Sequence, residues 1–395
     1  MKKSLLLLSL LSLFLACEDK IEGIQSIPVI QISEAFDNPS PINLSELVSD
    51  IEYVQLETNS STLYRFPHIC GLIGDSLILL KDSKRISLFN RRTGGYVKDL
   101  GHAGDDPEGY RLSARNLGVN TFTNSVYASR NQEKLIGYPL DGRSALDFVN
   151  LPTIINQTDD MMSAGFLSAY SYLDSTHFLG YISNMSGSEK NRILIFDRSG
   201  DVKKSFPNHL TFENNPNRIQ FSITYLQTYN NEVMFKETYN DTIFHISLES
   251  MESAYVMSFQ SYGIPYEEQE TVVGNDLKER MRLTGILESD KFVCFEIDFQ
   301  GVSYSGLFEK ASGETRIAKN KELSHGYVND LDGFVAFKPS YISRNGELIS
   351  TIPAERIAEW FETHQDKISS LPPHIQILQN VQPEDNPIIM IGKLK

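Results

Sequence analysis

The dominant pattern along the chain is a short apolar stretch that ends in an aromatic residue and is followed by a polar turn. Most of these turns contain a glycine next to Asp, Asn, Arg or Ser. Asp and Asn side chains cap such turns, and glycine readily takes the positive φ angle that a tight turn needs. Six copies are present, with the aromatic residues Phe89, Tyr138, Phe196, Phe244, Phe308 and Tyr341. The pattern predicts repeated β-hairpins.

The length of the repeat indicates how these hairpins are arranged. Successive copies are spaced by roughly 50 residues, which is typical of the four-stranded blades of β-propellers. Runs such as residues 192–196 and 291–297 are almost continuously apolar, as expected for strands that are buried on both faces. Sheets stacked around an axis bury such strands and leave only short edges. We therefore predict an all-β fold, a six-bladed β-propeller. An array of β-sandwiches stays open as an alternative, because the spacing is uneven and the fourth copy lacks the turn glycine.

Two terminal strands and two helices complete the expected architecture. Residues 51–57 and residues 386–395 both have strand patterns, and pairing them within one blade would close the ring. A helix is predicted over residues 353–369, because it begins with proline and has apolar residues at helical spacing. A second helix is predicted over residues 267–283. Both are expected to be short insertions in the propeller.

The first residues have the features of a targeting sequence. Lys2 and Lys3 precede a mainly apolar run of 12 residues, 5–16, which has signal-peptide length and is too short to cross a bilayer. The run ends in Ala16–Cys17, which resembles the lipobox of bacterial lipoproteins, where the cysteine becomes acylated. We expect a signal peptide over residues 1–16, lipidated Cys17 with a tether over residues 17–40, and the propeller over residues 41–395. An ordinary secretory signal with an incidental cysteine is the alternative.

Composition excludes one class of partner. The chain has 395 residues, with 36 Lys and Arg against 51 Asp and Glu, for a net charge of −15. Binding to nucleic acid needs a basic surface, so nucleic acid is not an expected partner. Besides Cys17, Cys70 and Cys294 lie among apolar neighbours. They are expected to be buried thiols, with a disulfide as the alternative in an oxidising envelope.

Several segments together resemble a known group of proteins. These segments are residues 44–58, 101–110, 240–244, 329–333 and 386–388. The chain is similar to the six-bladed β-propeller lipoproteins found in the envelopes of Gram-negative gut anaerobes. The resemblance covers nearly the whole mature chain and implies the propeller fold. The function of that family is largely uncharacterised, so the resemblance supplies no catalytic residues.

Candidate ligand-binding residues lie in two polar segments and at one further histidine. The segment 101–110 contains three carboxylates beside a histidine, and clustered oxygen ligands of this kind suit Ca²⁺. The segment 329–333 resembles half of an EF-hand loop, without the glutamate that would complete it. The alternative for both is an ordinary turn, so the metal is left open and no cofactor is expected. The candidates are His102, Asp105, Asp106, Glu108, His325, Asp330 and Asp332.

Function is less constrained by the sequence than fold. No H-E-x-x-H, G-x-S-x-G or phosphate-binding loop is present. We expect an outer-membrane lipoprotein, facing the periplasm or the cell surface, whose propeller binds a partner protein, a peptide or a glycan without catalysis. Aromatic residues in segments 169–172 and 260–266 could stack on sugar rings. The alternatives are a lyase or glycan hydrolase with an axial His and carboxylate site, such as His102 with His325, and a structural subunit of an envelope complex.

Overall fold

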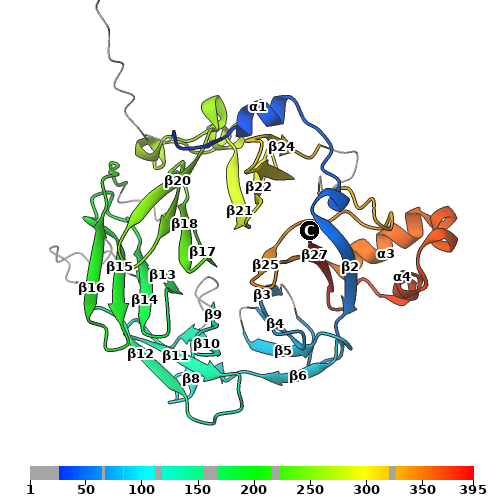
Figure 1. The fold of residues 1–395 in the computed structure, drawn as a ribbon, viewed down its shortest axis with the longest axis horizontal. Coiled ribbons are helices and arrows are strands. Elements are labelled where there is room, and N and C mark those ends of the chain that lie inside the picture. Colours follow the sequence, from blue (N-terminus) through cyan, green and yellow to red (C-terminus); the bar gives the residue numbers. More distant parts are fainter. Residues whose placement is uncertain are drawn as a thin grey trace, which may run out of the picture.

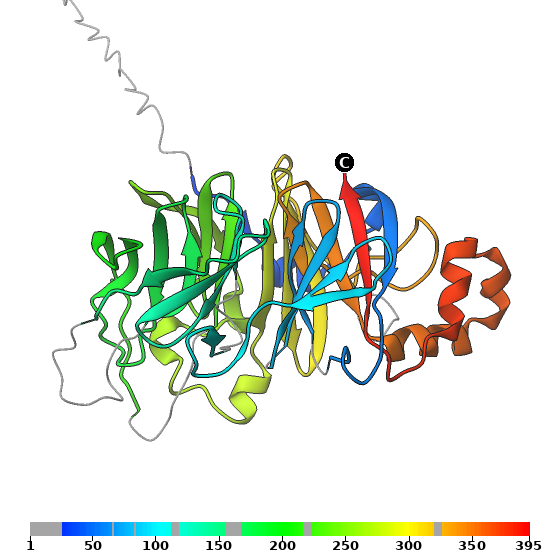
Figure 2. The ribbon, with the colours of Figure 1, turned by 90° about the horizontal axis from the view of Figure 1, so that it is seen from below.

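The chain forms a ring of radial β-sheets around a central axis (Figure 1). The computed structural model describes residues 26–64, 67–82, 84–111, 118–154, 167–215, 223–319 and 326–395. Six sheets of four or five strands follow one another around the ring. In each sheet the innermost strand lies at the axis, and the strands run between the two faces of the ring (Figure 2). The predicted six-bladed β-propeller is confirmed.

The first five blades use consecutive antiparallel strands, numbered outward from the axis. Blades 1 and 2 contain β3 (His68–Ile73), β4 (Leu77–Lys81), β5 (Ile86–Asn90) and β6 (Tyr96–Asp99), then β9 (Gly118–Asn120), β10 (Ser125–Ser129), β11 (Lys134–Pro139) and β12 (Asp147–Asn150). Blade 3 contains β13 (Leu167–Tyr172), β14 (His177–Ile182), β15 (Asn191–Asp197) and β16 (Val202–Pro207). Blades 4 and 5 contain β17 (Thr224–Tyr229), β18 (Glu232–Glu237), β19 (Thr242–Ile246) and β20 (Met251–Met257), then β21 (Arg282–Glu288), β22 (Phe292–Phe299), β23 (Val302–Glu309) and β24 (Thr315–Ile317).

Blade 6 closes the ring with strands from both ends of the chain. Its order from the axis is β25 (Tyr341–Ser343), β26 (Glu347–Ile352), β27 (Ile388–Leu394) and β2 (Val48–Gln55). β2 and β27 pair antiparallel, with Tyr53 opposite Met390. The predicted pairing of the first and last strands is thus confirmed, and it leaves no unpaired gap between the first and last blades.

The position of the repeated aromatic residues explains why the last interval of the repeat is the shortest. Five of them lie on the third strand of a blade, namely Phe89, Tyr138, Phe196, Phe244 and Phe308. Tyr341 instead lies on β25, the innermost strand of blade 6. The third strand of that blade is β27, which comes from the end of the chain. The number of blades was therefore predicted correctly, although the sixth copy was aligned to the wrong strand.

The segment before β2 wraps around the outside of three blades, and we call residues 29–46 the N-terminal strap. β1 (Val29–Ile30) pairs parallel with β20, α1 (Ile32–Asp37) contacts β24, and η1 (Leu44–Glu46) leads into β2. Lys319 Nζ lies 3.4 Å from the ring centroid of Phe36, and Arg316 Nη2 lies 2.7 Å from Glu46 Oε2. The tether expected over residues 17–40 therefore overlaps the folded body from Val29 onward.

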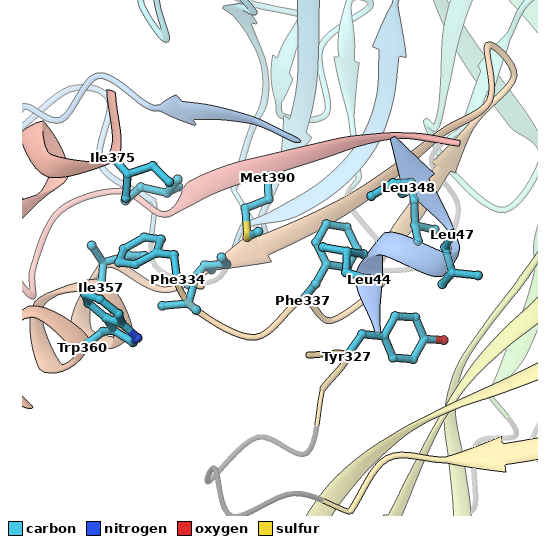
Figure 3. Packing of buried hydrophobic residues seen from close by; sticks show 14 of the residues in the cluster. Leu44, Leu47, Tyr327, Phe334, Phe337, Leu348, Ile357, Trp360, Ile375 and Met390 are labelled. Atoms are coloured by element: carbon cyan, nitrogen blue, oxygen red, sulfur yellow. The ribbon is translucent and has the colours of Figure 1, made fainter. Parts of the chain in front are cut away.

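The helical insertion between β26 and β27 lies against the outside of blade 6 (Figure 1). It consists of α3 (Ala354–Thr363), η4 (Gln365–Ser370), α4 (Pro373–Gln376) and η5 (Ile377–Asn380). Ile357, Trp360 and Phe361 of α3 are buried, and the Trp360 ring lies 4.7 Å from the ring of Phe334 (Figure 3). The helix predicted over residues 353–369 is confirmed for the ten residues Ala354–Thr363.

The second predicted helix, over residues 267–283, is wrong. That region holds η3 (Tyr266–Glu268), the single turn α2 (Asn275–Lys278) and the start of β21, after η2 (Gln260–Tyr262). Gly274 has a φ of 60°, which interrupts a right-handed helix, and the chain must extend again by Arg282 to begin blade 5. In the described residues no helix is long and apolar enough to cross a membrane.

Candidate functional site

A cavity of about 1060 Å³ lies on the axis of the ring, and we call it the axial cavity. All six innermost strands, β3, β9, β13, β17, β21 and β25, contribute to its lining. The lining continues into the turns that follow β17, β21 and β25, at residues 230–231, 289–291 and 344–346. β27 runs in the same direction as β25, so these turns lie on the face of the ring that also carries the C-terminus (Figure 2). We call this end of the cavity the mouth.

One side of the mouth holds a cluster of rings around an arginine, the aromatic–arginine cluster (Thr121, Phe122, Tyr172 and Arg344). Arg344 Cζ lies 5.1 Å from the ring centroid of Phe122 and 6.0 Å from that of Tyr172. The two rings meet edge to face, with centroids 6.2 Å apart. Arg344 also donates a hydrogen bond to Thr121 Oγ1. Stacking on two rings restricts the guanidinium to one position, so the cluster joins blade 6 to blades 2 and 3.

Buried polar contacts hold the turns that carry this cluster. Asn120 is fully buried, and its Oδ1 accepts a hydrogen bond of 2.9 Å from the amide of Phe122. Its Nδ2 donates to the carbonyl of Asp174, in the turn after Tyr172, at 3.3 Å. Partial burial opposes ionisation of Asp174, but hydrogen bonds from His177 and nearby amides outweigh it and lower the pKa of Asp174 to about 2. A charged Asp174 therefore fixes its turn at neutral pH.

The other side of the mouth presents a phenol and a carboxylate from blades 4 and 5. The Tyr229 hydroxyl donates to Asp290 Oδ1 at 3.0 Å and accepts a hydrogen bond from Lys310 Nζ at 3.2 Å. Burial, reinforced by Asp290, raises the pKa of Tyr229. The phenol therefore remains protonated at neutral pH and serves as a hydrogen-bonding group rather than as a base.

A buried charged network (Glu288, His245 and Lys310) lies behind this phenol and links blade 4 to blade 5. Glu288 has an exposed side-chain fraction of 1%. Its Oε1 accepts from Lys310 Nζ at 2.7 Å, and its Oε2 lies 2.8 Å from His245 Nε2. Burial favours the neutral carboxyl, but the hydrogen bond to His245 and the charge of Lys310 outweigh it and hold the pKa of Glu288 below its usual value. The Gln227 side chain exchanges two hydrogen bonds of 2.8 Å with the backbone of Glu288.

Two further titratable groups of the lining, His68 and Cys70, lie on β3 deeper along the axis. Burial, followed by the charge of Lys81, lowers the pKa of His68. Burial raises the pKa of the Cys70 thiol to about 11. Cys70 and Cys294 are free thiols on different blades. Cys294 is buried, as expected, whereas Cys70 is half-buried. Among the described residues no group of three His, Cys, Asp or Glu side chains could hold a metal ion.

Comparison with known proteins places this architecture in a family. Residues 27–393 match the model of a family described as a domain of unknown function, DUF4934. The chain belongs to this family. No curated protein sequence matches it.

Several solved structures are similar to this chain at low sequence identity. A "putative exported protein" of Bacteroides fragilis has 16% identity and a TM-score of 0.65, over 90% of this chain and 98% of its own. An oligogalacturonate lyase in complex with manganese has 8% identity and a TM-score of 0.41, over 83% and 88% of the two chains. The oligogalacturonate lyase of Vibrio parahaemolyticus has 9% identity and a TM-score of 0.38, over 79% of each chain. At 16% identity and a TM-score of 0.65, the likeness to the Bacteroides protein shows a common fold.

The candidate residues of segment 101–110 lie in the connection between β6 and β9. This connection contains the parallel pair β7 (His102–Ala103) and β8 (Gly109–Tyr110). His102 Nε2 lies 2.6 Å from Asp106 Oδ2, and Asp106 Oδ1 accepts from the amide of Glu108 at 3.0 Å. Asp105 pairs with Arg111 at 2.9 Å. The structure brings these four candidates together, but none of them lines the axial cavity.

The candidate aspartates of segment 329–333 hold the start of the chain in place. Asp330 accepts a hydrogen bond of 2.9 Å from the amide of Ser45, and Asp332 accepts one of 2.7 Å from the Tyr53 hydroxyl. These contacts join the segment to the N-terminal strap and to β2, away from the cavity lining. His325 and Cys17 lie outside the described residues. A ligand-binding role for all these candidates stays a prediction.

The residues at the mouth were only partly visible in the sequence. Tyr170 and Tyr172, in the aromatic segment 169–172, do line the cavity. The segment 260–266 does not, since Tyr262 packs on Phe36 and Tyr266 is buried. Arg344 belongs to the polar turn that follows Tyr341, and no sequence motif marks it as a ligand-binding residue. Its place in the repeat could have identified it, because the turn that follows the innermost strand of each blade lies at the axis.

Proposed function

We propose that this protein is a lipid-anchored envelope protein whose axial cavity binds an oligosaccharide without chemically altering it. The observation that carries the proposal is the cavity itself, whose volume of about 1060 Å³ lies at the upper end of the range for ligand-binding pockets. A cavity of this size accommodates several sugar rings. It is concave, formed by six blades, and lined by convergent polar groups.

The character of the lining supports a sugar ligand. Sugars present many hydroxyl groups and flat apolar ring faces, so their sites combine hydroxyl, amide and aromatic side chains. The cavity offers all three kinds, including the tyrosines Tyr170, Tyr172 and Tyr229. Its hydroxyl and amide side chains include Thr121, Ser171, Thr224, Gln227, Thr228, Asn230, Asn231, Thr284, Ser340 and Asn345. A peptide or a partner protein is the competing ligand and forms a separate arm of the binding test.

Protonation states at the mouth support binding rather than catalysis. Glu288 is a charged carboxylate already paired with Lys310 and His245, and Tyr229 keeps its proton because its pKa is raised. The Cys70 thiol is likewise held protonated at neutral pH. None of these groups has the protonation state and the reactivity that a nucleophile or general base near neutral pH needs.

The second candidate function is a propeller enzyme, a lyase or glycan hydrolase. It is favoured by His68, which lines the cavity and whose lowered pKa leaves a neutral imidazole able to accept a proton. The two functions differ in what happens to a bound oligosaccharide. Chromatography of the ligand after prolonged incubation separates them, since only an enzyme produces fragments whose amount rises with time.

Filling the axial cavity is expected to abolish oligosaccharide binding. An oligosaccharide and peptide array identifies the ligand set, and calorimetry measures its affinity for Ser171→Trp. Ser171 lines the cavity, so an indole at this position occupies the space of a sugar ring, and we expect a loss of at least about 10-fold. Ser312→Trp, in an exposed turn of blade 5, is the matched control and should bind normally. Unchanged binding by a folded Ser171→Trp variant would contradict the proposal.

The lipid anchor is a separate part of the proposal. It is supported by the apolar run before Cys17 and by the description of the Bacteroides relative as exported. Cells expressing the full chain are expected to incorporate radiolabelled palmitate into the protein, and Cys17→Ala is expected to abolish this labelling. Cys70→Ser serves as the control and should be labelled like the natural chain. Continued labelling and membrane retention of Cys17→Ala would exclude the anchor.

A further inference from the structure

Arg344 is one of five arginines of the described residues with no carboxylate at ion-pair distance, and among these arginines it is the one that lines the axial cavity. The other four are Arg85, Arg92, Arg130 and Arg280. Eight arginines of the described residues lie within 4 Å of a carboxylate, as expected in a chain with 51 acidic and 36 basic residues. They are Arg91, Arg111, Arg143, Arg192, Arg198, Arg282, Arg316 and Arg356. Arg344 is exposed at the mouth, and no carboxylate of the described residues lies at ion-pair distance from it.

The guanidinium of Arg344 is nevertheless held in place. The two rings of the aromatic–arginine cluster support it at 5.1 and 6.0 Å, and Thr121 Oγ1 accepts one of its hydrogen bonds. A guanidinium carries five N–H donors, so most of them remain for a ligand. The Thr121 contact joins residues 223 positions apart in the chain. The arginine is therefore preorganised by the fold and does not have to be ordered when a ligand binds.

The acidic groups of the cavity are already engaged elsewhere. Glu288 Oε1 accepts from Lys310 at 2.7 Å, and Glu296 Oε1 lies 3.3 Å from Lys338 Nζ. Asp290 accepts the hydrogen bond of Tyr229. Arg344 thus faces an axial cavity whose three side-chain carboxylates have their own donors, although the protein as a whole is strongly acidic.

We infer that Arg344 is the anion-recognition residue of the axial cavity and that the ligand is an acidic oligosaccharide with carboxylate-bearing sugar units. The planar fork of a guanidinium matches the two oxygens of a carboxylate, and such charge-assisted pairs are among the strong hydrogen bonds of proteins. The sugar part of this inference rests on the proposed function. The carboxylate part rests on Arg344 alone, so the two can fail separately.

The experiment measures binding by calorimetry at low salt, with uronic acid oligosaccharides and their carboxyl-reduced, neutral counterparts as probes. The proteins are the natural sequence, Arg344→Gln, Arg344→Lys and the control Arg356→Gln, which removes an exposed arginine on α3. Glutamine keeps a planar group that can still bond Thr121, so the turn is expected to stay folded. Thermal unfolding of each variant verifies this.

We expect the natural sequence to bind an acidic probe at least about 10-fold more tightly than its neutral counterpart. Arg344→Gln should lose about 10- to 100-fold of the affinity for the acidic probe and at most about two-fold for the neutral one. Arg344→Lys should retain an intermediate affinity, because lysine keeps the charge but not the fork. Arg356→Gln should bind like the natural sequence, and added salt should weaken only acidic binding.

Three results would overturn the inference. Equal binding of acidic and neutral probes would remove the role of the carboxylate while leaving the proposed oligosaccharide function standing. Undiminished acidic binding by folded Arg344→Gln would remove the role of this residue. Binding of acidic peptides in an Arg344-dependent way, with no acidic oligosaccharide bound, would show that both the ligand class inferred here and the proposed function are wrong.

Discussion

Replacing Glu288 by alanine is expected to lower the free energy of unfolding by about 3–5 kcal/mol, the usual cost of removing one partner from a buried ion pair. The carboxylate is 1% exposed and accepts hydrogen bonds from Lys310 at 2.7 Å and from the Tyr255 hydroxyl at 3.2 Å. Its loss leaves the ammonium group and His245 without their shared counterion between blades 4 and 5. Urea unfolding followed by circular dichroism measures the effect.

The matched control is Glu359→Ala on α3. That carboxylate is 48% exposed and pairs with Arg356 at 3.1 Å, so its removal should cost less than about 1 kcal/mol. A Glu288→Ala variant as stable as Glu359→Ala would show that the charged network does not hold the two blades together.

The contribution of Glu288 to the free energy of unfolding is also expected to depend on pH. Its pKa is lower in the folded protein than in the unfolded chain, because His245 and Lys310 favour the charged form over the burial that opposes it. A lowered folded pKa gives stability that is complete above the unfolded value of about 4.5 and is lost as the pH falls through the folded value. The stability difference between the natural sequence and Glu288→Gln should therefore be constant near neutral pH and shrink below about pH 4.5. A difference that grows on acidification would contradict this.

The second large effect is expected at Gly94, in the third turn of blade 1. Gly94 has a φ of 70°, and a Cβ at this position would overlap the backbone carbonyl oxygen of Gln55 on β2. The Gly94 carbonyl also accepts a hydrogen bond of 2.9 Å from the amide of Glu57. Gly94→Ala therefore forces the turn away from the strand that closes the ring.

Gly313 provides a control that isolates this clash. It is the glycine of the corresponding turn in blade 5, its φ is 73°, and nothing lies within 4 Å of its Cβ position. In both variants the alanine has to adopt a left-handed backbone conformation, which lowers the free energy of unfolding by about 1–2 kcal/mol. Gly94→Ala should cost about 1–3 kcal/mol more, because only there does the backbone have to move. Equal midpoints of thermal unfolding for the two variants would contradict the packing of blade 1 on β2.

Local patterns were sufficient to predict the ring. Polar turns with glycine mark the ends of strands, and continuous apolar runs such as β15 and β22 identify strands buried on both faces. The closing pair was predictable because a ring of sheets has to join its two ends. The helix expected over residues 267–283 failed because its apolar positions are used by loops and by β21, and the positive φ of Gly274 ends any helix there.

The site was less predictable, because it is made by residues that are distant in the chain. The contact of Arg344 with Thr121 spans 223 positions, and neither residue belongs to a recognisable motif. The conspicuous acidic segments instead stabilise connections: Asp106 engages its own loop, and Asp330 engages the N-terminal strap. Sequence patterns identify the residues that form local turns. Which side chains meet at the axis depends instead on which strand of each blade lies innermost.

A crystal structure of the protein with the tightest-binding oligosaccharide from the array tests binding in the axial cavity most directly. We expect density for sugar rings in the cavity, with an acidic group against Arg344 and a hydroxyl within hydrogen-bond distance of Tyr229. Sugar bound instead at the connection of residues 101–110, or on the outer strands of the blades, with the cavity unoccupied, would contradict this expectation.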